Sequence, residues 1–410
     1  MRAVVQVKWP VNDPGLNNTA VTNHSPLPKA APPPAGRIAC FDGLRGVAAV
    51  IVVVFHYICL LHPTLTPDLS AQVHWLADTP VHILWNGLFS VSVFFVLSGF
   101  VMAAAADRRR GVLIASSLTR YLRLALPAAA SCLLAWGWLS AFPDSAQALE
   151  DSLATPSRWL DYTYQHSIRP IWYAGADGLL GNFVRGYSDF NNVLWTMQVE
   201  LLGSLGIFLV YALCRRGWAR LLALLAAGAA VLLWLPDTYT GFLLGAALFE
   251  AHRRGLLRPA SMLPPALALV AALAMGGMGN GAHLRLGLPD VPQAWELGEP
   301  RGIMSAVAAA LLVYATLTLP PLGRVFARPL PVFLGRISFG LYLVHVPPLY
   351  TIVAWSYLRG VPEAVLFPAY AASVLLLAWL FTLAVDEPSL KGLSALRARL
   401  GAGRPLLQPR

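Results

Sequence analysis

The sequence predicts an all-α protein, a polytopic bundle of about ten transmembrane helices with both termini in the cytosol. Its 410 residues are 57% hydrophobic and only 12% charged, whereas soluble domains carry about twice that share of charged residues. Apolar runs recur from residue 43 to residue 386, and a helix needs roughly 20 apolar residues to cross about 30 Å of hydrocarbon. The net charge of +10 does not indicate nucleic-acid binding, because the basic residues cluster between the apolar runs.

Ten apolar segments are the candidate spans, and the sixth is the shortest. They lie near residues 43–61, 83–105, 122–142, 190–213, 219–235, 239–251, 263–279, 303–319, 333–357 and 365–386. With the N-terminus in the cytosol, ten crossings put most Lys and Arg residues on the cytosolic side, whereas omitting the sixth span divides them almost evenly. Since cytosolic loops are enriched in Lys and Arg, we predict ten crossings.

The segments outside the spans differ from them in composition. Residues 1–36 are polar and Pro-rich with no early apolar run, which indicates a disordered cytosolic tail and not a signal peptide. Residues 37–388 form the predicted transmembrane domain, and residues 389–410 form a basic cytosolic tail. In the sixth span, Gly241 and Gly245 lie one turn apart, a pattern that would let this span pack closely on a neighbour.

The first span carries two ionisable residues that share one face. Arg45 and His56 are eleven residues apart, which is three helical turns and roughly 16 Å along the axis. An ionisable group inside a span normally faces the bundle interior or a water-filled cavity. The unperturbed pKa of imidazole suits proton abstraction near neutral pH, so His56 is a candidate general base. The alternative is a structural histidine that is hydrogen-bonded within the bundle.

Spans three and four add two guanidiniums and a carboxylate. Arg120 and Arg123 lie three residues apart at the predicted cytosolic mouth, where they would share a helix face. They could bind phosphates through their planar donor forks, or they could anchor the helix among lipid headgroups. Glu200 lies near mid-membrane and needs a proton or a cationic partner, for which His56 and an Arg are both candidates.

The ninth span has a polar stripe, and the tenth ends in acidic residues. Ser338, Tyr342 and His345 follow at intervals of four and three residues, which indicates either functional groups or a structural polar seam. Pro347 and Pro348 are expected to break or kink the helix just beyond His345. At the cytosolic end of span ten, Asp386-Glu387-Pro388 could pair with Arg45 or Arg336.

These residues fit two reaction classes, acyl transfer from a phosphate-bearing donor and proton-coupled transport of an anion. At the same positions the chain resembles the acyltransferase-3 family of multi-span membrane O-acyltransferases. The matching elements span residues 37–388 in order: Arg45-x10-His56, Phe94–Phe100, Arg120-x-x-Arg123, Trp195-Thr196-x-x-x-Glu200, Ser338–His345 and Asp386-Glu387-Pro388. Phe339 departs from a usual Tyr, and Ser389 stands where Pro is expected.

The resemblance implies an acyl-CoA donor, most often acetyl-CoA, and no metal. Arg120 and Arg123 would hold the phosphates of the donor, with the pantetheine arm running past Arg45. His56 would deprotonate the acceptor hydroxyl, and Glu200 would orient His56. The developing thioester oxyanion needs a nearby donor, for which Tyr342 is a candidate.

The expected acceptor is a hydroxyl of an extracytoplasmic or lipid-linked glycan. The expected partners are membrane lipid and other polysaccharide-assembly proteins, and the expected location is the inner membrane of a bacterium. Two alternatives stay open: a secondary transporter of an anionic metabolite, and a non-catalytic protein of polysaccharide assembly. The sequence has no visible internal repeat, and many transporters contain such repeats.

Overall fold

The structure is a computed structural model in which every regular element is a helix, within the residues that it describes. These residues are 38–66, 74–108, 113–153, 157, 159–160, 169–214, 217–234, 237–277 and 300–401. The predicted all-α class is confirmed for this part of the chain. The predicted N-terminal tail (1–36) and the end of the predicted C-terminal tail lie outside the described residues, so the cytosolic placement of both termini stays a prediction.

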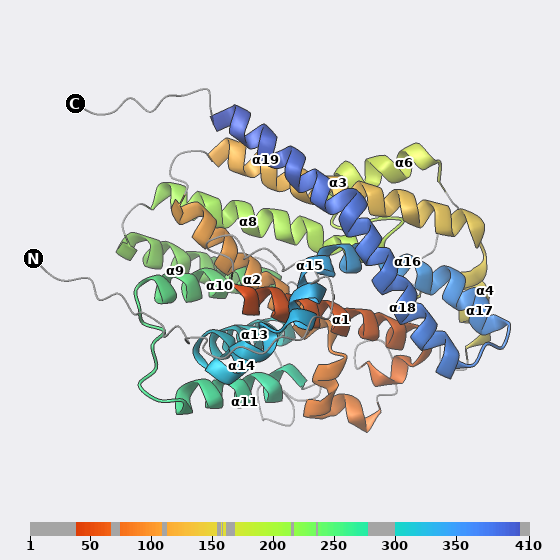
Figure 1. Ribbon diagram of the computed structural model, residues 1–410, viewed down its shortest axis with the longest axis horizontal. Helices are drawn as coiled ribbons and strands as arrows, with labels where there is room; N and C mark the ends of the chain where they lie inside the picture. Colours follow the sequence, from red (N-terminus) through yellow and green to blue (C-terminus); the bar gives the residue numbers. More distant parts are fainter. Residues whose placement is uncertain are drawn as a thin grey trace, which may run out of the picture. The chain divides into compact units, whose positions relative to one another are not determined.

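The helices follow one another along the whole described chain (Figure 1). The long ones are α1 (Ala39–Leu61), α2 (Gly87–Arg108), α3 (Leu113–Ala141), α8 (Trp195–Leu213), α9 (Gly217–Trp234), α10 (Thr240–Arg253), α11 (Leu263–Gly277), α13 (Pro300–Thr318), α15 (Pro329–Val344), α18 (Glu363–Phe381) and α19 (Glu387–Gly401). The short ones are α4 (Ser145–Ser152), α6 (Ile171–Ala176), α7 (Asn182–Arg185), α14 (Pro320–Phe326), α16 (Val346–Pro348) and α17 (Ala354–Leu358).

Single turns of 3-10 and π geometry connect several of these helices. The 3-10 turns are η1 (Pro63–Leu65), η2 (Trp75–Asp78), η3 (Pro80–Leu84), η5 (Asn192–Leu194) and η6 (Asp237–Tyr239). The π turns are η4 (Asp177–Gly181), η8 (Leu349–Val353) and η9 (Thr382–Asp386). Two of the π turns contain acidic residues described below, Asp177 in η4 and Asp386 in η9. Such turns are often found at functional sites.

In the part of the chain that the structure describes, five helices are long and apolar enough to cross a membrane, and the number rises to seven if each of two bent helix pairs is one span. The prediction of ten crossings is therefore not confirmed, although each predicted segment coincides with a helix. The predicted spans at α9, α10 and α11 fall short in length. For example, α10 has 14 residues, which extend about 21 Å and not the roughly 30 Å of a hydrocarbon core.

Prolines bend two of the helices inside the bundle. The axes of α13 and α14 meet at 99°, and α15 and the helix that follows it meet at 50°. The second bend falls at His345, directly before Pro347 and Pro348, so the predicted break is confirmed. The tenth predicted span does not end at Asp386, because α18 continues through the π turn η9 into α19.

Helix α1 contacts both α15 and α2, and its glycines permit a close approach to α15. A Cβ atom at Gly46 would overlap the backbone nitrogen of Gly335, and one at Gly335 would overlap the carbonyl of Asp42. Small residues at such crossings let two backbones touch within a membrane bundle. Gly241 and Gly245 likewise bring α10 against the backbone of α2, as their spacing predicts.

We expect Gly46→Ala to lower the melting temperature of the detergent-solubilised protein by about 1–4 °C, because overpacking costs roughly 1–3 kcal/mol. Gly206→Ala, on α8, is the matched control. An added Cβ at Gly206 meets no atom within 4 Å, and alanine favours a helix, so this variant should melt at the wild-type temperature or above it. Equal melting temperatures for the two variants would contradict the close α1–α15 contact.

Candidate active site

His56, on α1, faces His345 at the bend that follows α15. The Nε2 atom of His345 lies 3.0 Å from Nδ1 of His56, and the ring centroids are 4.9 Å apart. His345 is fully buried, whereas His56 is only partly buried. The close contact of α1 with α15 thus pairs two histidines that are 289 residues apart in the chain.

The acceptors around the two rings determine where their protons lie. Nδ1 of His345 lies 3.0 Å from the carbonyl oxygen of Leu341 and 2.9 Å from that of Tyr342. A carbonyl oxygen only accepts, so this Nδ1 carries a proton, and Nε2 of the neutral ring is an acceptor. Nδ1 of His56 faces that acceptor and the Val52 carbonyl oxygen, at 3.0 Å each, so it too carries a proton. In neutral His56 the lone pair is therefore on Nε2.

The bend that presents His345 depends on Pro347. Proline has no N–H, so the carbonyl of Leu343, four residues earlier, loses its helical donor. The side-chain nitrogen of Asn191 donates to this carbonyl at 2.7 Å, and the Tyr370 hydroxyl donates to the carbonyl of His345 at 3.0 Å. These two side chains stabilise the bend, because a buried carbonyl without a donor costs free energy.

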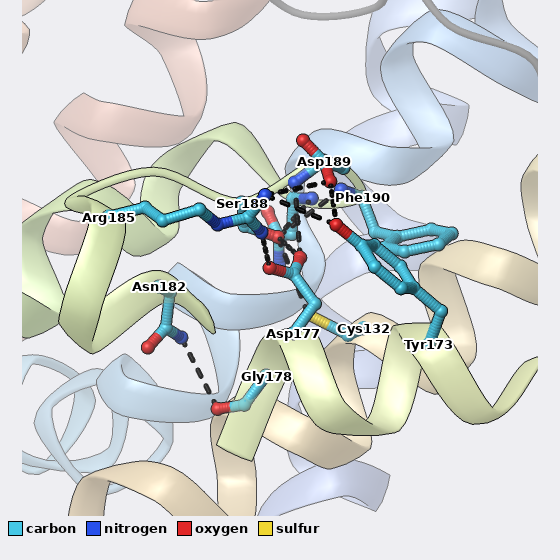
Figure 2. Close-up of polar contacts among 10 residues, drawn as sticks. Cys132, Tyr173, Asp177, Gly178, Asn182, Arg185, Ser188, Asp189 and Phe190 are labelled. Atoms are coloured by element: carbon cyan, nitrogen blue, oxygen red, sulfur yellow. Dashed lines mark hydrogen bonds and ion pairs between the residues drawn. The ribbon is translucent and has the colours of Figure 1, made fainter. Parts of the chain in front are cut away.

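Asn191 is held in turn by a polar network in the segment that precedes it (Figure 2). The buried carboxylate of Asp177, on η4, pairs with Arg185 and accepts from the Ser188 hydroxyl at 2.5 Å and the Asp189 N–H at 3.1 Å. The Ser188 oxygen accepts the N–H of Asn191 at 3.2 Å. The network therefore fixes the backbone from which the Asn191 side chain reaches the bend.

The two carboxylates of this network differ in their electrostatic environment. Burial raises the pKa of Asp177 above its ordinary value, against the opposing effects of Ser188 and Arg185. Burial also acts on Asp189, yet hydrogen bonds from Tyr173 and Arg185 hold the pKa of Asp189 below its ordinary value. Figure 2 shows the Tyr173 hydroxyl directed at Asp189, to which it donates at 2.9 Å. Arg185 thus bridges both carboxylates.

Tyr342, the candidate oxyanion donor, has a hydroxyl that is already hydrogen-bonded within the bundle. It donates to the Val193 carbonyl at 3.1 Å and accepts from the Thr196 hydroxyl at 2.9 Å. The phenol therefore ties α15 to the start of α8, one turn from His345. Ser338, on the same stripe, is also buried, and its hydroxyl donates to the Gly335 carbonyl at 2.9 Å.

Glu200, on α8, forms an ion pair with Arg120, on α3. The Ser98 hydroxyl donates to the same carboxylate at 2.5 Å, and the Ser204 hydroxyl accepts from Nε of Arg120 at 2.9 Å. The prediction that Glu200 needs a cationic partner is confirmed, and the partner is Arg120. Within the described part of the chain no hydrogen bond joins Glu200 to His56.

Arg123 and the acidic end of span ten form a second ion pair. Both guanidinium NH groups of Arg123 face the Asp386 carboxylate, and the guanidinium carbon lies 4.7 Å from the centre of the Phe339 ring. Glu387 pairs with Arg336 at 2.6 Å, which was one of the two pairings expected from the sequence. The planar fork of an arginine suits this bidentate, stacked geometry.

Arg45 differs from Arg120 and Arg123 in its contacts with the described residues. It forms no hydrogen bond or ion pair with any residue that the structure describes, and it is partly exposed. Its guanidinium experiences the charges of the neighbouring residues Asp42, Glu200, Arg120 and Arg123. Arg45 and His56 share the uninterrupted helix α1, about 16 Å apart along its axis. Up to five N–H donors of Arg45 can therefore bind a ligand.

Sequence reasoning leaves the role of His345 open and does not single out Asn191 or Asp177. Pro347 indicates that some other residue must donate a hydrogen bond to the helix, because a proline inside a helix leaves one carbonyl without its donor. Asn191 is that residue. No spacing in the sequence links Asp177 to the bend. The described ranges contain no group of three or more His, Cys, Asp or Glu residues placed to hold a metal ion.

Comparison with known proteins identifies the family of the chain. The sequence profile described as "Acyltransferase domain" matches residues 38–383. The chain is similar to "Acyltransferase R4" of Phoma sp. (strain ATCC 20986 / MF5453), with 25% identity over 470 aligned residues that cover 90% of this chain and 96% of that protein. No solved structure matches the chain. The chain therefore belongs to the acyltransferase-3 family.

Proposed function

We propose that this protein transfers an acyl group, most simply acetyl, from cytosolic acyl-CoA to a hydroxyl of an extracytoplasmic or lipid-linked glycan. The observation that carries the proposal is the ring of His56, whose Nδ1 proton is engaged and whose Nε2 lone pair is available to a substrate. Membership of the family supports acyl transfer in general. The choice of acetyl-CoA and of a glycan rests on the resemblance of the motifs.

The proposed reaction is a single displacement. The acceptor hydroxyl gives its proton to Nε2 of His56 while its oxygen attacks the thioester carbon. The C–S bond then breaks, and the thiolate of CoA takes the proton back from His56, which leaves an ester and free CoA thiol. Tyr342 is the proposed donor to the thioester oxygen in the transition state, in exchange for its bond to Val193.

The hydrogen-bonding capacity of Arg45 supports a phosphate-bearing donor at the arginine group. The carboxylates of Glu200 and Asp386 pair with Arg120 and Arg123, whereas Arg45 has no such pair among the described residues. An anion that reaches Arg45 finds an uncommitted guanidinium next to two more cationic groups. The ion pairs with Glu200 and Asp386 would hold the guanidiniums of Arg120 and Arg123 in place for the same ligand.

We expect His56→Ala to reduce turnover by roughly 10²–10⁴-fold, because a general base contributes about that much to catalysis. The assay follows thiol release from acetyl-CoA by protein in nanodiscs, with and without an extract of cell-surface glycan. The matched control is His62→Ala at the end of the same helix, where an exposed His62 contacts Glu363 at 2.7 Å. If the wild-type protein releases no thiol but moves anions into proteoliposomes, the result would refute acyl transfer and support transport.

The loss of Arg45 and the loss of Arg123 should differ in their effect on stability. We expect Arg45→Gln to raise the KM for acetyl-CoA by roughly 10- to 100-fold, since a charge-assisted hydrogen bond contributes about 1.5–3 kcal/mol. Its melting temperature should stay near that of the wild type, because no ion pair is lost.

Arg123→Gln is the comparison variant for this measurement. It leaves the Asp386 carboxylate, whose side chain is only 6% exposed, without its partner, so it should lower the melting temperature. An unchanged KM in Arg45→Gln would refute the assignment of Arg45 to the donor phosphates.

A further inference from the structure

The environment of His56 gives its partner His345 a role that goes beyond packing. Among the described residues, the His345 ring makes three hydrogen bonds: two with carbonyl oxygens at Nδ1 and one with His56 at Nε2. Each contact is a hydrogen bond at 2.9 or 3.0 Å. A fully buried imidazole with both nitrogens engaged is fixed in one orientation and one tautomer.

We propose that His345 is a positioning residue that, together with the Val52 carbonyl, keeps a proton on Nδ1 of His56 and thereby keeps Nε2 of His56 as the base. The proposal rests on the proposed function, in which that Nε2 receives the proton of the acceptor hydroxyl. When the proton arrives, the His56 ring becomes an imidazolium. Its Nδ1–H then donates to the neutral Nε2 of His345, which stabilises the new charge.

A neutral partner suits this location in the membrane bundle better than a carboxylate does. The third group of the familiar Ser-His-Asp arrangement is an ionised carboxylate that orients its histidine. A buried carboxylate among apolar helices carries a large desolvation cost unless a cation accompanies it. Glu200, the carboxylate that the sequence suggested for this task, is instead bonded to Arg120 and Ser98.

The backbone around His345 prevents its ring from turning to another partner. The Leu341 and Tyr342 carbonyls lie beside Nδ1, and Asn191 and Tyr370 donate to the carbonyls of Leu343 and His345 at the bend. A group that must orient a base within a fraction of an ångström needs such support. If the His345 ring turned over, its Nε2 would no longer face His56.

His345→Gln and His345→Met test this proposal as a matched pair. The two side chains are unbranched and similar in size, but only glutamine has an oxygen that can accept from Nδ1 of His56. In nanodiscs, we expect His345→Met to lower turnover with acetyl-CoA by about 10²-fold or more. His345→Gln should recover to within about tenfold of the wild type, and the KM for acetyl-CoA should change less than about threefold in both variants.

Ser338→Ala is the control, because it removes only the bond from the Ser338 hydroxyl to the Gly335 carbonyl, three residues earlier on the same helix. Its turnover should match the wild type. A folded His345→Met that turns over like the wild type, or a folded His345→Gln as slow as the methionine variant, would overturn the proposal. Wild-type protein without any thiol release would instead refute the proposed function.

A measurement on the wild type covers the case in which the variants do not fold. Nitrogen-15 NMR of histidine-labelled protein distinguishes a protonated ring nitrogen from an unprotonated one, and the signals that disappear in His56→Ala identify that ring. We expect neutral His56 to carry its proton on Nδ1. A proton on Nε2 of His56 would overturn the proposal whether or not the protein shows activity.

Discussion

Every polar group that lies among apolar helices must find a partner within the protein, because hydrocarbon offers none. This constraint accounts for most of the side-chain contacts of the candidate site. It pairs Glu200 with Arg120 and Asp386 with Arg123. It also leaves the Nδ1 proton of His345 bonded to two backbone carbonyls. Arg45 and Nε2 of His56 have no such partner among the described residues, and they are the groups that the proposed function assigns to the substrates.

The bend at His345 has a local cause, and side chains from elsewhere in the chain stabilise it. Pro347 removes a helical donor, and a free carbonyl inside the bundle would be destabilising. Asn191 supplies the missing donor, and Asp177 and Ser188 hold the backbone that presents Asn191. A helix without the bend would continue past His345 in the direction of α15. The carbonyls of the last turn of α15 accept from Nδ1 of His345, and this bond fixes the tautomer of the histidine pair.

Close backbone contact determines how far the two histidines lie apart. Gly46 and Gly335 let α1 and α15 touch, and the two rings then meet at hydrogen-bond distance further along the same pair of helices. Larger residues at the crossing would separate the helices, and a hydrogen bond weakens steeply when its atoms move apart. The contact between the two histidines therefore depends on glycines that lie several turns away along the two helices.

The sequence by itself determined where the helices lie, the shared face of Arg45 and His56, the bend after His345, and the need of Glu200 for a cation. These properties follow from hydropathy, helical periodicity and the missing N–H of proline, all of which are local. It did not determine the number of crossings, because helices such as α10 are apolar yet too short to span. Only the tertiary structure decided that Glu200 pairs with Arg120 and that His56 pairs with His345, since contacts between residues 80 and 289 positions apart depend on how the helices pack.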